Sequence, residues 1–134
     1  MVDLARVESV PSLAALSEPV KRALADELDE VDVPAGERIV SQGDFAYELF
    51  AILEGTAQVE QDGEVVATLG TGDVCGEIGL LLTGRRTAAI VAETPVRMLA
   101  LFDQTFRRLV GEHPEFAELI RSQSRDRFTR PATV

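Results

Sequence analysis

The residues best suited to chemistry lie in one short segment, GEIGLLLTGRRTAA, which spans residues 76–89. Gly76 and Glu77 open it, an apolar run follows, and Arg85 and Arg86 stand side by side near its end. A guanidinium fork meets the oxygens of a phosphate with paired, charge-assisted hydrogen bonds. Adjacent arginines usually lie on a solvated surface, but these lead into TAAIVA, which is typical of a buried strand. The segment therefore indicates a site for a small anion.

Charge and composition argue against several classes of function. The chain has 134 residues, with 23 Asp and Glu against 13 Lys and Arg and a net charge of -10. Such an acidic surface argues against nucleic-acid binding, which needs a cationic one. It does not exclude a small anion, because salt screens the protein's long-range field beyond about 8 Å. We therefore expect local arginines to decide affinity.

Few residues are available for catalysis or for metal binding. One histidine, His113, and one cysteine, Cys75, cannot supply the clustered ligands of a zinc or iron site. The sequence also offers no catalytic triad and no Walker loop. We expect no enzyme activity, no metal and no cofactor beyond a ligand.

Signals for export or for membrane insertion are absent from the sequence. No secretory signal precedes PSLAAL, and the apolar stretches are shorter than the roughly 18–20 residues of a membrane span. A single cysteine rules out an internal disulfide, which fits a reducing compartment. We expect a cytoplasmic protein with no membrane span.

The periodicity of apolar residues divides the chain into three zones. In residues 1–28 the apolar residues have helical spacing, and Ser17 followed by Pro19 predicts the start of a helix. The apolar positions of this zone are Leu13, Leu16, Val20, Leu24 and Leu28. Residues 29–102 contain many short strand-like runs punctuated by glycines, and Asp62-Gly63 predicts a hairpin. These runs indicate a β-sandwich or barrel.

Helical patterns return in residues 103–130. Asp103 is the expected N-cap of a first helix that stops at Gly111, and Pro114 begins a second. The second helix has one largely apolar face, formed by Phe116, Leu119, Ile120 and Gln123.

The segment GDVCGEIGLLLTGRRTAAIVA resembles the phosphate-binding cassette of the cyclic nucleotide-binding domain family. SQGDFAYELFAILEG resembles the glycine-aspartate turn and the following strand of that family, and the resemblance covers nearly the whole chain. GRRTAA is most similar to cassettes of cyclic nucleotide-gated and hyperpolarisation-activated channels, and GEIGL to catabolite-activator-type regulators. The resemblance implies an α+β fold: N-terminal helices (1–28), an eight-stranded antiparallel β-roll (29–102), and hinge and lid helices (103–130), in a single domain over residues 1–134.

The resemblance also implies roles for individual residues. Arg86 would hold the cyclic phosphate, Glu77 would accept from the ribose 2′-hydroxyl, and Thr87 would offer its hydroxyl to the phosphate or the base. Arg85 occupies a place where the family often has proline, so we expect a solvated side chain. The expected ligand-binding residues are Gly76, Glu77, Ile78, Gly79, Arg86, Thr87 and Ala88, with Val59, Ala67 and Leu69 lining the base pocket and Arg127 on the lid.

Several alternatives and departures accompany these roles. Glu77 and Arg86 could instead form a plain intramolecular ion pair, and Arg127 and Phe128 could be exposed residues near a fraying end. Cys75 stands where an aromatic residue usually precedes the Gly-Glu pair, and Ala89 replaces a common Ser or Thr. Neither departure touches the phosphate clamp.

The function implied is a stand-alone sensor that binds a cyclic nucleotide and passes the signal, through its lid helix, to an unknown protein partner. cAMP is the expected ligand, and cGMP is possible because the Thr87 hydroxyl could favour guanine by about two- to tenfold. The alternative is a degenerate domain that acts as a protein-interaction module without nucleotide. A DNA-binding regulator is a third possibility, opposed by the acidic charge and by the lack of a helix-turn-helix segment in the sequence.

Overall fold

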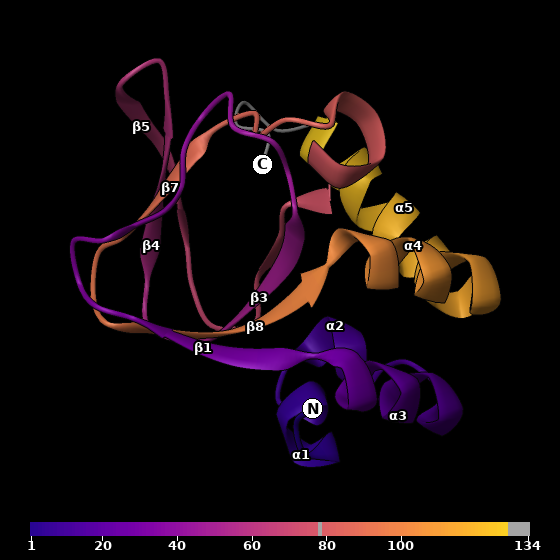
Figure 1. The fold of residues 1–134 in the computed structure, drawn as a ribbon. Coiled ribbons are helices and arrows are strands. Elements are labelled where there is room, and N and C mark those ends of the chain that lie inside the picture. Colours follow the sequence, from indigo (N-terminus) through magenta and orange to yellow (C-terminus); the bar gives the residue numbers. More distant parts are fainter. Residues whose placement is uncertain (78, 129–134) are drawn as a thin grey trace.

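Two antiparallel sheets form the body of the molecule (Figure 1). The computed structural model describes residues 1–77 and 79–128, with side chains except at positions 82 and 124–128. Within this described part, the first sheet has the order β1 (Asp29–Val33), β8 (Val96–Phe102), β3 (Glu48–Glu54) and β6 (Val74–Cys75). The second has the order β2 (Arg38–Val40), β7 (Ala89–Ala92), β4 (Ala57–Gln61) and β5 (Glu64–Leu69). The predicted eight-stranded antiparallel roll in an α+β fold is confirmed.

Helices gather on one side of the roll (Figure 1). α1 (Leu4–Glu8), α2 (Pro11–Ala14) and α3 (Glu18–Glu27) precede it, and α4 (Asp103–Glu112) and α5 (Pro114–Phe128) follow it. A single π-helical turn, Gly79–Thr83, interrupts the strands between β6 and β7. In the part of the chain that the structure describes, no helix combines the length and the apolar character needed to span a bilayer.

Two apolar cores lie on opposite faces of the first sheet. The roll interior is built from alternate residues of both sheets, such as Phe50, Val59 and Ile90. The outer face of the β3/β8 sheet packs against the helices, where the Phe106 and Phe116 rings meet edge to face with centroids 6.0 Å apart. All five apolar positions predicted in the first zone are buried in this second core: Leu13, Leu16, Val20, Leu24 and Leu28.

The β4–β5 hairpin forms at the predicted turn. Asp62 and Gly63 both have positive φ, at 54° and 82°, as a two-residue turn that follows the strand twist requires. Asp62 also exchanges two hydrogen bonds with Gln42: its backbone N–H donates to Oε1 at 2.9 Å, and Gln42 Nε2 donates to Oδ1 at 3.1 Å. The hairpin tip is therefore tied to the loop between β2 and β3.

Helix ends differ slightly from the predictions. Ser17 is the N-cap residue of α3, but its hydroxyl caps none of the described amides, and its backbone N–H donates to the Glu115 carboxylate at 2.6 Å. The N-cap of α4 is Phe102 and not Asp103, because β8 stays paired with β3 up to that residue. α4 then passes the predicted stop at Gly111 and ends one residue later.

Candidate functional site

The phosphate-binding cassette, residues 76–89, is held by the loop of residues 41–47. The backbone N–H of Gly43 donates to Arg86 O at 2.9 Å, and the backbone N–H of Arg86 donates to Asp44 O at 2.7 Å. Both backbone polar groups of Arg86 are therefore bonded to the loop. This pairing fixes the point from which the arginine side chain leaves the backbone.

The π-helical turn brings the cassette backbone close to that loop. The Gly84 N–H donates to Gly79 O at 2.8 Å, across five residues. A Cβ on Gly79 would lie only 3.0 Å from Ala46 Cβ and 3.0 Å from Arg85 O, so the contact requires a residue without a side chain. Turns of this kind occur frequently at functional sites.

The Arg86 side chain lies in the interior, with only 6% of the residue exposed. Its Nη2 donates to the backbone oxygen of Glu48 at 2.9 Å and lies 3.7 Å from that residue's Oε2. The guanidinium also stands over the Phe50 ring, 5.3 Å from its centroid. Nη1 is buried and has no hydrogen-bond partner among the residues that the structure describes.

The Arg86 guanidinium is a charged group removed from water, and this burial affects its pKa. Desolvation lowers the pKa of Arg86, and the Glu48 carboxylate, followed by Cys75, partly offsets the shift. An arginine nevertheless stays protonated, and a buried donor without a partner carries a desolvation cost. An oxyanion placed against Nη1 would remove that cost and add a charge-assisted hydrogen bond.

Gly76 allows Arg86 to reach this position. Its φ is 99°, and a Cβ there would lie 2.8 Å from Arg86 Nη1 and 3.0 Å from Glu48 O. Any side chain at position 76 would therefore push the guanidinium away from the backbone of β3.

We expect Gly76→Ala to destabilise the fold more than Gly84→Ala does, by about 1–3 kcal/mol, the usual cost of overpacking. Gly84 is the matched control, because it also has a positive φ, at 71°, but a Cβ there has no neighbour within 4 Å in the described structure. Urea unfolding of both variants measures the difference. Equal losses of unfolding free energy would mean that only backbone strain matters at position 76.

Five predicted site residues surround one small cavity of about 10 Å³, which has room for about one water. They are Gly76, Gly79, Arg86, Thr87 and Ala88, joined by Val40 and Ile90. Glu77 is fully buried next to this group in the sequence. Val59 and Leu69 are buried in the roll interior, and Ala67 packs against the same core, so these three do not line the cavity itself.

Two predicted residues cannot be placed. Ile78 lies outside the described residues. Arg127 belongs to α5, but its side chain lies outside the described part of the chain, as does that of Phe128.

A second hollow, of about 400 Å³, opens on Arg86 as well. Arg85 lies at its edge with an exposed side chain, as expected: it stacks over the Phe45 ring at 4.2 Å and donates to Gly43 O at 2.9 Å. Two carboxylates, those of Asp44 and Glu48, also line this hollow. Their negative charge disfavours a phosphate, so the glycine-lined cavity is the better anion site.

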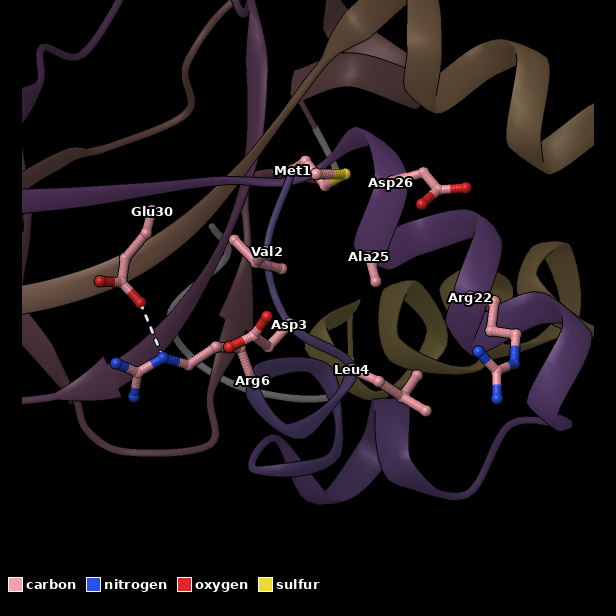
Figure 2. A pocket seen from close by; sticks show the side chains of 9 residues that line it. All are labelled: Met1, Val2, Asp3, Leu4, Arg6, Arg22, Ala25, Asp26 and Glu30. Carbon is pink, nitrogen blue, oxygen red and sulfur yellow. Dashed lines mark ion pairs between the residues drawn. The ribbon is translucent and has the colours of Figure 1, made fainter.

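A further hollow, of about 620 Å³, lies at the N-terminal helices, and its lining comes from residues 1–6, from α3 and from β1 (Figure 2). Its arginines already have carboxylate partners. Arg6 pairs with Glu30 at 3.0 Å, and Arg22 pairs with Glu18 at 2.7 Å. Within the described residues, no group of three His, Cys, Asp or Glu is arranged to hold a metal ion.

Two contacts of the cassette were not anticipated from the sequence. Glu48, from the start of β3, is the carboxylate that the structure places against Arg86, where the sequence had suggested Glu77 as a possible partner. Gln61, at the end of β4, donates through Nε2 to the Thr87 backbone oxygen at 3.3 Å. The predicted hairpin placed Gln61 beside a turn, but no local signal in the sequence indicated its contact with the cassette.

Comparison with known proteins agrees with this geometry. The sequence profile of the cyclic nucleotide-binding domain family matches residues 30–113. The cAMP-dependent protein kinase regulatory subunit of Schizosaccharomyces pombe is 37% identical over 91% of this chain, and the type II regulatory subunit of Drosophila melanogaster is 39% identical over 78%. The chain spans 29% of the length of each of these two proteins.

Solved structures show the same fold. A putative cyclic nucleotide-binding protein from Geobacter metallireducens superposes with a TM-score of 0.81 at 20% identity, covering 91% of this chain and 92% of that one. The regulatory subunit of a cAMP-independent protein kinase A from Trypanosoma brucei has a TM-score of 0.82 at 26% identity, covering 91% and 44%. This chain belongs to the cyclic nucleotide-binding domain family.

Proposed function

We propose that this domain binds cAMP in preference to cGMP, with Arg86 holding the cyclic phosphate. The buried Nη1 of Arg86, with no hydrogen-bond partner among the described residues, is the observation that carries the proposal. The N–H groups around Gly76 and Gly79 would assist, and Glu77 would accept from the ribose 2′-hydroxyl. Thr87, Ala88, Val59, Ala67 and Leu69 would surround the base, with Ile78 and Arg127 completing the set.

Two comparisons support cAMP as the ligand. The curated relatives named above are regulatory subunits of cAMP-dependent kinases. A triple variant of the trypanosome subunit, 29% identical to this chain with a TM-score of 0.78, carries cAMP in its A site. Its substitutions introduce an alanine, then an arginine seven residues later, and a second alanine directly after that. This chain has the same spacing: a small residue at Gly79, an arginine seven residues later at Arg86, and a further small residue directly after it at Thr87.

One observation favours the alternative, a protein-interaction module that binds no nucleotide. The cavity beside Arg86 holds about one water, and Glu48 already lies against the guanidinium. The trypanosome relative is itself described as belonging to a cAMP-independent kinase. A cyclic nucleotide would therefore need to open the cassette, which also makes binding a conformational signal.

Calorimetric titration with cAMP, cGMP and linear 5′-AMP separates the two functions. The proposed function predicts binding of both cyclic nucleotides, tighter for cAMP, and much weaker binding of 5′-AMP. Binding of none of the three would favour the interaction module.

We further propose that α5 carries the signal to a protein partner. Phe116 and Ile120 anchor its first half in the helical core, whereas Arg121 and Ser122 are exposed. A ligand can shift the second half only through its differential affinity for the two states. Since the relatives regulate protein kinases, a kinase catalytic subunit is the first partner to test.

Cyclic nucleotide should slow amide exchange in residues 121–128 by several-fold or more, because local protection follows from newly buried contacts. Residues 115–120 provide the internal control, since their buried face already packs in the absence of ligand. Hydrogen exchange with and without saturating cAMP measures both segments. Unchanged exchange in residues 121–128 would remove α5 from the signalling mechanism.

A further inference from the structure

An arginine of α4 donates to the backbone of the cassette. The π-helical turn of residues 79–83 joins N–H groups to carbonyl oxygens five residues earlier. The Arg85 N–H departs from this pattern, because it donates to Thr83 Oγ1 at 3.1 Å where the pattern would have used Leu80 O. Leu80 O accepts instead from Nη2 of Arg107, in α4, at 2.9 Å. A positively charged donor therefore binds a carbonyl oxygen near the end of the turn, as arginines do at helix ends.

This hydrogen bond joins the cassette to the helices that follow the roll. The π-helical turn lies on the side of the roll that carries α4 and α5 (Figure 1). Leu80 is only 2% exposed and belongs to the helical core, and its contact with Arg107 is partly buried. Hydrogen bonds from charged donors are stronger than those between neutral groups. The contact therefore favours the position of the turn in which Leu80 O reaches Arg107.

The cassette is packed too closely in this position to hold a cyclic nucleotide. The cavity beside Arg86 has about 10 Å³, room for about one water. A Cβ on Gly79 would already lie 3.0 Å from Ala46 Cβ, so the turn is close to the β2–β3 loop. Space for a phosphate and a ribose must therefore come from movement of the turn. Such movement separates Leu80 O from Arg107 unless α4 moves with it.

We propose that Arg107 holds the empty cassette closed through Leu80, so that a bound nucleotide must break this hydrogen bond. The inference deepens the proposed function and rests on it. A contact made only in the closed state lowers the apparent affinity, because fewer molecules are competent to bind. Phe106, beside Arg107 in α4, packs against Phe116 of α5. Breaking the bond therefore also removes a restraint on the pair of C-terminal helices.

Arg107→Met should bind cAMP about two- to tenfold more tightly than the wild-type protein, the range for one hydrogen bond that is partly exposed to solvent. Methionine keeps an apolar stem but has no donor, whereas Arg107→Lys should stay close to wild type because an ammonium can still donate to the carbonyl. Calorimetric titration of the full chain gives the three dissociation constants. Loosening of the fold or loss of a positive charge would weaken binding of an anion, so a gain in affinity has neither cause.

Arg108→Met is the matched control on the same helix. Arg108 pairs with Glu27 at 2.7 Å and with Glu112 at 3.0 Å, and so lacks the contact with the cassette. The same substitution there should change cAMP affinity by less than about twofold. Equal gains in the two variants would show that a general effect of α4, and not release of Leu80, sets the affinity.

Hydrogen exchange tests the closed state without any ligand. In the empty protein, the amides of residues 79–85 should exchange several-fold faster in Arg107→Met than in the wild type, and saturating cAMP should remove the difference. Unchanged exchange in the empty variant, or a cAMP affinity that is unchanged or weaker, would overturn the role of Arg107 while leaving the proposed function intact. Failure of both the wild type and the variant to bind cAMP would overturn the proposed function itself.

Discussion

Arg86→Ala is expected to weaken cAMP binding by roughly 30-fold to several thousandfold. Removing one partner of a buried, hydrogen-bonded charge pair costs about 2–5 kcal/mol, because the other charge is left without its counterpart. Arg86 is buried with its guanidinium over the Phe50 ring, and its Nη1 lies beside Gly76. Among the described residues that line the glycine-lined cavity, no other side chain carries a positive charge. Calorimetric titration of the variant measures the loss.

Arg85→Ala provides the neighbouring control. Its guanidinium is exposed and engaged with Phe45 and the Gly43 carbonyl, so cAMP affinity should change by less than about twofold, within the small effect of most surface substitutions. Arg86→Lys should give an intermediate loss, since lysine keeps the charge but not the two-pronged geometry. Equal losses of cAMP affinity in Arg85→Ala and Arg86→Ala would show that Arg86 does not have the special role of holding the phosphate.

Glu77→Ala should abolish most of the discrimination between cAMP and 2′-deoxy-cAMP. A hydrogen bond to a charged acceptor contributes about 1.5–3 kcal/mol, so the wild-type protein should favour the ribose form by roughly 10- to 150-fold. Glu77 has no exposed surface, so water would replace the lost carboxylate poorly. Parallel titrations with the two ligands give the ratio for each protein.

Glu77→Gln separates the loss of the hydrogen bond to the ribose from a loss of structural stability. The amide keeps an acceptor of similar shape but loses the charge, so it should retain part of the discrimination. If Glu77→Ala kept the wild-type ratio of affinities for cAMP and 2′-deoxy-cAMP, the buried carboxylate would have only a structural role.

Much of the fold follows from local signals in the sequence. The Asp62-Gly63 pair favours a turn with two positive φ angles, and it forms the β4–β5 hairpin. Helical spacing from Leu13 to Leu28 identified a buried face, because each of those positions lies in the helical core. Pro114 starts α5 as expected, since proline fits the first turn of a helix.

Contacts between distant segments could not be predicted in this way. Glu48 lies 38 residues from Arg86, and only the pairing of the β2–β3 loop with the cassette brings them together. The same holds for Gln61 and Thr87, which β4 and β7 align across the second sheet. The cassette motif indicated which residues would cluster, whereas the charged partner of its arginine depended on tertiary structure.

The central claim is that the buried Arg86 guanidinium receives the phosphate of a cyclic nucleotide. A crystal structure of the complex with cAMP tests it most directly. The account predicts phosphate oxygens about 2.7–2.9 Å from the Arg86 nitrogens, with the phosphate against Gly76 and Gly79. A phosphate bound elsewhere, with Arg86 still directed only at Glu48, would contradict it.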